Sequence, residues 1–263
     1  MSPTGDRLGN AVGWPSGPDG RLRLARLRLA RLIPRQLRLA LIDKVPRDHH
    51  QPDRAFRRRR WVVAVTLVVG TVLLGLSLSV RPGHASFYPL TAALAATWLL
   101  GGLASGPLHL GRIAVRGALR RPVLTPIAIG LAFVAVFLLG ALVVREIGPL
   151  ADYTQRVLAL ARRGSLPLLV LLTVANGITE EVFFRGALYA ALGARHPVLI
   201  STAVYAVATI ATGNPMLVFA ALTLGVVLGL QRRAPGGLLA PMLTHVTWSV
   251  SMLLALPPLF AGR

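Results

Sequence analysis

The 263-residue sequence contains no cysteine and few acidic residues. The absence of cysteine excludes disulfides, thiolate nucleophiles and metal sites built on thiolates. Charged residues make up 14% of the chain, against about 25% in a typical soluble domain. Beyond residue 60 there are only four acidic residues and 14 basic ones. This shortage of charge argues against a soluble globular protein.

The sequence also lacks any helix-turn-helix, zinc-finger or RNA-binding signature, although its net charge is +20. The basic residues instead flank hydrophobic stretches. In that position, positive charge usually reports membrane topology and contact with anionic lipids. We therefore expect no nucleic-acid partner.

Apolar residues make up 54% of the chain and are concentrated after residue 60. Residues 1–60 hold 15 of the 29 basic residues and form a polar basic arm. Within the arm, residues 1–20 have the composition of a disordered terminus, and 21–33 that of an arginine-rich segment, either at the lipid surface or solvated. The sequence thus predicts a cytoplasmic arm, disordered to amphipathic, that binds anionic lipid, followed by a membrane domain over 61–263.

Seven apolar runs in this domain predict an all-α, polytopic membrane helix bundle. They lie at about 61–80, 87–105, 123–144, 165–191, 197–211, 215–230 and 237–256. The runs at 197–211 and 215–230 are short for a hydrocarbon core about 30 Å thick. Residues 145–164 are more polar and indicate an amphipathic helix, with an eighth span left open.

The basic residues between the runs indicate how the chain is oriented. If the N-terminus is cytoplasmic, four basic groups share the cytoplasmic side: 57–60, 112–121, 195 and 232–233. Three arginines break this pattern: Arg156, Arg162 and Arg163. Arginine is abundant and Lys44 is the only lysine, which suggests a GC-rich bacterial genome. We expect a multi-pass protein of a bacterial plasma membrane with a cytoplasmic N-terminus.

Two glutamates and an arginine lie within the fourth apolar run, in the segment N-G-I-T-E-E-V-F-F-R-G. A helix places Glu181 and Arg185 on one face, while Glu180 points about 100° away and shares its face with Asn176. One glutamate can then face a catalytic centre while the other pairs with the arginine. The alternative is an ion pair that only fixes helix register. Ionisable residues inside a membrane favour the functional interpretation.

A histidine lies in the last apolar run, in the segment T-H-V-T-W-S. Ser249 follows His245 by four residues and therefore lies on the same helix face. Taken alone, such a histidine can be a helix-packing residue. Because Glu180, Glu181 and Arg185 are the only other ionisable side chains well inside a run, we expect all four to meet in one bundle.

These residues resemble the CPBP intramembrane proteases, which include CAAX-processing endoproteases and bacteriocin-processing, self-immunity and abortive-infection proteins. Residues 180–186, E-E-V-F-F-R-G, resemble the motif Glu-Glu-x-x-x-Arg with its aromatic-Arg-Gly ending. His245 with Ser249 resembles His-x-x-x-Asn, with serine in place of asparagine. The resemblance covers about residues 165–256, which would form the protease-like core.

The resemblance implies an endopeptidase that cuts a membrane protein or peptide. Glu180 would activate the hydrolytic water, and Glu181 with Arg185 would order the site. His245 would be a metal ligand or acid–base group, and Ser249 an oxyanion donor. A zinc ion, where present, would be held by Glu180 and His245.

The sequence departs from the family at Phe-x-x-x-His, which aligns with Tyr205 to Thr209. Thr209 replaces a histidine, and catalytic zinc usually takes three protein ligands, so a weak metal site is expected. Thr209, Asn214 or Asn176 can instead hold a water. Two alternatives stay open: a catalytically decayed scaffold or self-immunity protein, and a small proton-coupled transporter. Against the transporter, the two halves of the chain lack matching interrupted helices.

Overall fold

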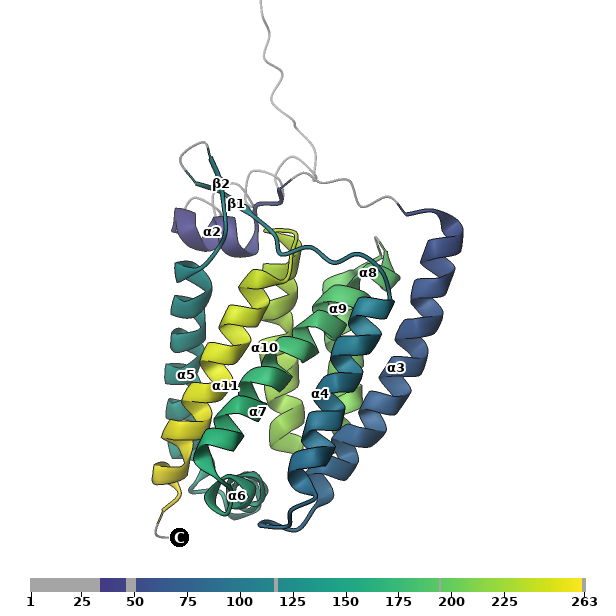
Figure 1. The fold of residues 1–263 in the computed structure, drawn as a ribbon. Helices are drawn as coiled ribbons and strands as arrows, with labels where there is room; N and C mark the ends of the chain where they lie inside the picture. The colour runs from purple at the N-terminus through teal and green to yellow at the C-terminus, as the bar shows by residue number, and fades with distance from the viewer. Residues whose placement is uncertain (1–33, 46–50, 116–117, 194, 262–263) are drawn as a thin grey trace, which may run out of the picture.

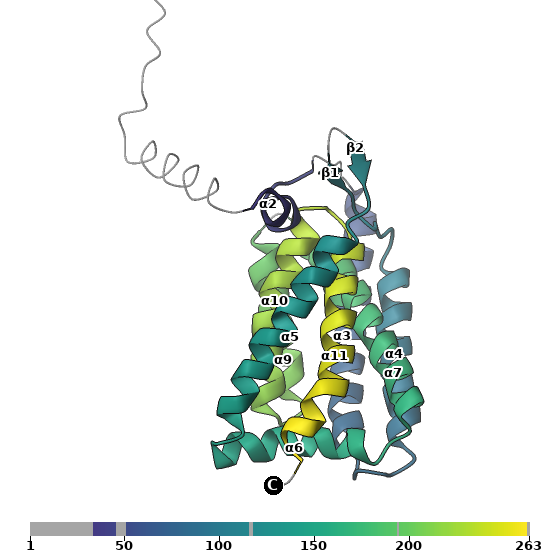
Figure 2. The same ribbon diagram turned by 90° about the vertical axis from the view of Figure 1, so that its left-hand side faces the viewer.

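The computed structural model describes residues 34–45, 51–115, 118–193 and 195–261. Within these residues, long helices run side by side in a single bundle, with a small β-hairpin at one end (Figures 1 and 2). The predicted all-α membrane bundle is confirmed. The predictions for residues 1–33 concern a segment outside the described residues.

Six helices in the described part of the chain are long and apolar enough to cross a membrane. They are α3 (Asp53–Ser79), α4 (Phe87–Ala104), α5 (Leu124–Val144), the continuous helix Leu166–Leu192, α10 (Pro215–Arg233) and α11 (Leu239–Leu259). The continuous helix consists of α7 (Leu166–Glu181), the π-helix η1 (Val182–Leu188) and α8 (Tyr189–Leu192). The fifth predicted run, 197–211, forms α9 (Pro197–Ile210), whose 14 residues span only about 21 Å. It is an apolar helix, but shorter than the hydrocarbon core.

The polar segment after α5 forms α6 (Gly148–Arg162), which lies across one end of the bundle (Figure 2). Its buried residues are Ala151, Thr154, Leu158 and Leu160. Asn214, in the turn between α9 and α10, donates its Nδ2 to the Tyr153 carbonyl of α6 at 2.8 Å. Residues 145–164 therefore contain the amphipathic helix that the sequence predicts. This helix supports the turn between α9 and α10 instead of forming an eighth span.

The opposite end of the bundle carries the short helix α2 (Arg35–Leu41) and the antiparallel strands β1 (Ile113–Val115) and β2 (Ala118–Arg120) (Figure 1). Backbone hydrogen bonds join the loops there, including Leu238 N to His109 O at 2.8 Å. The described members of the four basic groups expected to share a side lie at this end. Of the three exceptions, Arg156 and Arg162 lie in α6 and Arg163 directly follows it. Helix α3 begins at Asp53, eight residues before the predicted start of the span, so the basic cluster 57–60 is helical.

An aromatic cluster packs η1 against α3 and α4. The ring centroid of Trp98, on α4, lies 4.6 Å from the ring centroid of Phe183 and 5.1 Å from that of Phe184. Gly70 on α3 has no side chain, and a Cβ atom there would collide with the Trp98 ring. This close helix approach fixes η1 from one side, and η1 carries part of the polar cluster described next.

Candidate functional site

The polar cluster begins where α7 changes into the π-helix η1. Glu180 and Glu181 are the last two residues of α7, and Arg185 lies in η1. All seven residues of η1 are buried, so this segment is packed on every side. π-Helical turns are rare and are frequently found at functional sites. A buried π-helix that carries a charged residue is therefore a strong structural marker of the site.

Glu181 and Arg185 form the predicted ion pair. Arg185 Nη1 donates to Glu181 Oε1 at 2.9 Å, and both side chains are 0% exposed. Arg185 Nη2 also donates to the Gly225 carbonyl of α10 at 3.4 Å. Arg232, near the end of α10, donates its Nε to the Arg185 carbonyl at 2.6 Å. The guanidinium of Arg185 is thus held both by a carboxylate and by the neighbouring helix.

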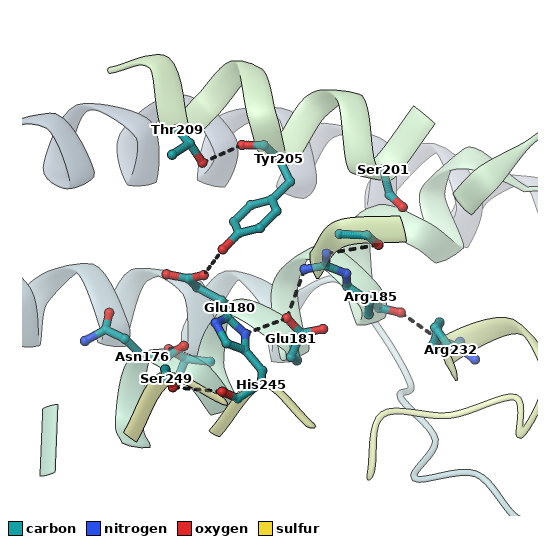
Figure 3. A network of polar contacts seen from close by, with 12 residues as sticks. Asn176, Glu180, Glu181, Arg185, Ser201, Tyr205, Thr209, Arg232, His245 and Ser249 are labelled. Atoms are coloured by element: carbon teal, nitrogen blue, oxygen red, sulfur yellow. Dashed lines mark hydrogen bonds and ion pairs between the residues drawn. The ribbon is translucent and has the colours of Figure 1, made fainter. Parts of the chain in front are cut away.

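His245 reaches the same carboxylate from α11, as Figure 3 shows. Its Nδ1 lies 2.9 Å from Glu181 Oε1. Because an ionised carboxylate only accepts hydrogen bonds, the contact requires a proton on Nδ1. In a neutral ring, Nε2 is then an acceptor. The expectation that the histidine meets the glutamates and Arg185 in one cluster is confirmed.

Glu180 has a different environment from its neighbour. It is half-buried, and its Oε2 accepts a hydrogen bond from the Tyr205 hydroxyl of α9 at 2.7 Å (Figure 3). In the sequence, Tyr205 serves only to align the second motif and has no predicted role. The available signal was the residue type, since tyrosine adds a hydroxyl to the ring that phenylalanine would supply at this position.

Three other predicted residues do not bond the glutamates. Thr209 Oγ1 donates to the Tyr205 carbonyl at 2.8 Å, and Ser249 Oγ to the His245 carbonyl at 2.8 Å. Asn176 Nδ2 donates to the Leu172 carbonyl at 2.9 Å. Each donor therefore bonds a backbone carbonyl one helical turn earlier, as polar side chains in helices commonly do.

The donor set does not fit a catalytic zinc ion, which usually takes three protein ligands with at least two histidines or cysteines among them. The described residues include no group of three or more histidine, cysteine, aspartate or glutamate side chains placed to hold a metal. His245 is the single imidazole, and its Nδ1 contacts Glu181 Oε1, which also accepts from Arg185. Glu180 Oε2 is engaged by Tyr205. We therefore assign no metal a role in this site.

One family model matches the segment that holds this cluster. Residues 162–251 match the model described as type II CAAX prenyl endopeptidase Rce1-like. The match confirms the resemblance to the CAAX-type intramembrane proteases over that segment, which includes both glutamates, Tyr205, Thr209 and His245. Comparison of the chain with curated proteins and with solved structures gives no match.

Proposed function

We propose that this chain, whose residues 162–251 match the Rce1-like family, is an intramembrane endopeptidase in which Glu180 activates the hydrolytic water. One observation carries the proposal: two adjacent glutamates have unequal partners. Glu181 is fully buried and contacts both Arg185 and His245. Glu180 is half-buried and accepts a hydrogen bond from a neutral hydroxyl. One carboxylate therefore organises the site, while the other is available for chemistry.

The depth of Glu180 indicates the class of substrate. Glu180 is 14 residues from the start of the 27-residue helix Leu166–Leu192, or about 21 Å along it. The whole helix is about 40 Å long, so Glu180 lies near its midpoint. In a spanning helix that midpoint lies near the middle of a hydrocarbon core about 30 Å thick. A scissile bond must reach the carboxylate at that depth. The proposed substrate is accordingly a membrane protein or a membrane-inserted peptide.

The electrostatics favour Glu180 as the base. Two ionised carboxylates in a low-dielectric interior repel each other, and a nearby cation offsets that repulsion. The guanidinium of Arg185 supplies this cation to Glu181. Glu180 is then spared the repulsion of an uncompensated neighbour. With its Oε2 bonded to Tyr205, its Oε1 is the oxygen that can accept a proton from water.

The proposed reaction divides the work between Glu180 and His245. A water donates one hydrogen bond to Glu180 Oε1 and the other to His245 Nε2. As its oxygen attacks the scissile carbonyl carbon, its proton passes to Glu180. The carbon–nitrogen bond then breaks, and Glu180 returns the proton to the leaving amine. Glu181 keeps the imidazole in the required tautomer, as a carboxylate bonded to Nδ1 does in other hydrolytic sites.

The test is a cleavage assay with the full-length protein in liposomes. A library of membrane-inserted peptides would be added, and products identified by mass spectrometry. We expect Glu180→Gln to lower the cleavage rate by about 100-fold or more, the scale of a lost general base. Glu146→Gln is the matched control, because Glu146 is an exposed carboxylate outside the cluster. Cleavage that survives Glu180→Gln would contradict the assignment of the base.

A chelator arm and the wild-type result complete the test. Since the donor set does not fit zinc, we expect cleavage to persist after exhaustive chelation. Loss of cleavage on chelation, with recovery on adding zinc, would overturn this expectation. If the folded wild-type protein cuts no peptide, the chain is a non-catalytic scaffold or self-immunity protein on the same fold. One observation favours that second candidate: Thr209 replaces a histidine of the family motif and bonds a backbone carbonyl.

A further inference from the structure

We infer that Tyr205 is the positioning residue for Glu180 and that its hydroxyl takes over the place of the histidine that the second motif lacks. The inference rests on the proposed function, because it concerns how Glu180 is oriented for hydrolysis. Tyr205 lies outside the residues that the family motif and the sequence pattern indicate as functional.

The first observation is the contact itself. The Tyr205 hydroxyl lies 2.7 Å from Glu180 Oε2, across 25 residues of sequence. This distance is typical of a short hydrogen bond from a hydroxyl to a charged acceptor. With Oε2 held by the phenol, the carboxylate group cannot rotate freely, and Oε1 is the oxygen left to meet a water.

The second observation is that the ring of Tyr205 is itself fixed. The Cζ atom of Arg185 lies 4.8 Å from the centroid of the Tyr205 ring, and the centroid of the Phe184 ring lies 4.6 Å from it. A guanidinium over its face and a tilted aromatic ring beside it together restrict the Tyr205 ring. The hydroxyl is consequently held in place before substrate arrives. Arg185, through its bond to Glu181, links the positions of both glutamates.

The third observation is that the two departures from the motif are complementary. Along Tyr205 to Thr209, the aromatic position gains a hydroxyl and the histidine position loses an imidazole. Thr209 does not restore the loss, because its hydroxyl donates to the Tyr205 carbonyl at 2.8 Å. The polar group that α9 does bring to the glutamates is the phenol, one helical turn before Thr209 (Figure 3).

The first experiment removes only the hydroxyl. In the liposome cleavage assay, we expect Tyr205→Phe to lower kcat by about 10- to 100-fold, the range for one hydrogen bond to a charged group. KM should stay within about twofold, because uniform binding is unaffected when a transition-state interaction is lost. Tyr153→Phe on α6 is the matched control, and both variants should keep the wild-type unfolding temperature. A Tyr205→Phe variant with wild-type kcat overturns the inference while leaving the role of Glu180 intact.

The second experiment rebuilds the family motif. Tyr205→Phe combined with Thr209→His restores Phe-x-x-x-His. We expect the kcat of this double variant to be at least tenfold higher than that of Tyr205→Phe alone. If Tyr205 only supports the fold, no such recovery is expected, because both variants carry phenylalanine at position 205 and so both lack the hydroxyl. A double variant no more active than Tyr205→Phe overturns the claim that the phenol replaces the imidazole.

A third readout does not need hydrolysis. Infrared difference spectra of protein with ¹³C-labelled glutamate carboxyls should show a carboxylate band that shifts between wild type and Tyr205→Phe. The shift should vanish when both proteins also carry Glu180→Gln. If the wild-type protein cuts nothing, the proposed function fails, yet this band still tests the Tyr205 contact. The absence of any shift overturns the inference independently of activity.

Discussion

Two arginines in the described part of the chain are completely buried, and their surroundings differ. Arg59, near the start of α3, donates to Gln51 Oε1 at 3.1 Å, Ser105 Oγ at 3.4 Å and the Pro107 carbonyl at 3.2 Å. All three acceptors are neutral. Arg185, in the middle of the bundle, instead pairs with the carboxylate of Glu181 at 2.9 Å. The same side chain is thus stabilised by dipoles in one region and by an opposite charge in the other.

The difference follows from depth. Arg59 is six residues from the start of its helix, beside the loop that follows α4, and there it ties two segments together. Farther inside, an unpaired charge is far more costly, so Arg185 requires a counter-ion. The counter-ion of Arg185 is the carboxylate of Glu181, and the same carboxylate also contacts His245. Charge compensation, more than burial, therefore separates the candidate site from a structural clamp.

The largest expected effect comes from breaking the paired region. Arg185→Met should destabilise the protein by about 3–5 kcal/mol, because Glu181 is left as a buried and uncompensated charge. Reversible unfolding in mixed micelles, followed by circular dichroism, would measure the change. A loss below about 1 kcal/mol would contradict the view that Arg185 is needed to compensate the charge of Glu181.

Neutralising both partners should reverse most of that loss. Glu181→Gln combined with Arg185→Met removes the pair together, and we expect it to regain about 2–4 kcal/mol relative to Arg185→Met alone. This double variant should not cleave peptides, because His245 no longer contacts the carboxylate of Glu181. The same unfolding and cleavage measurements apply. A double variant as unstable as the single one would show that the loss comes from packing and not from charge.

The smallest effect is expected at the clamp. Arg59→Met should cost about 1–3 kcal/mol, the scale of unsatisfied hydrogen bonds, since its partners carry no charge that would be left uncompensated. Cleavage of a membrane peptide should be unchanged in the folded fraction. The comparison between the two arginines fails if this variant loses as much stability as Arg185→Met.

Local periodicity explains what the sequence predicts well. The apolar runs locate the long helices, and the four-residue spacing of Glu181 and Arg185 places them in contact because neighbouring turns of a helix always do so. The amphipathic α6 is likewise a local property of residues 145–164. The sequence predicts that the first span starts at residue 61, where hydrophobicity begins. The helix in fact begins after Pro52, because arginines are good helix formers and nothing interrupts the helix between 53 and 61.

The features that escaped prediction depend on packing between distant segments. The contact of Tyr205 with Glu180 joins two helices whose relative rotation no single segment determines. Thr209 is a different case, because its hydroxyl has a backbone acceptor in its own helix and needs no partner across the bundle. The π-helix η1 has no composition that distinguishes it from an α-helix, and it is seen only in the hydrogen-bond pattern of the folded chain.

The contact between Asn214 and Tyr153 also bears on the order in which the protein is made. Helix α6 is synthesised before α9 and α10. The helix that contacts the turn between α9 and α10 is therefore present before that turn is made. Chains generally assemble from their N-terminal part first during synthesis. Helix α9, which is too short to be anchored at both membrane surfaces, can then dock together with α10 onto helices already in place. The sequence order of the elements thus supplies, during biogenesis, the support that α9 lacks in length.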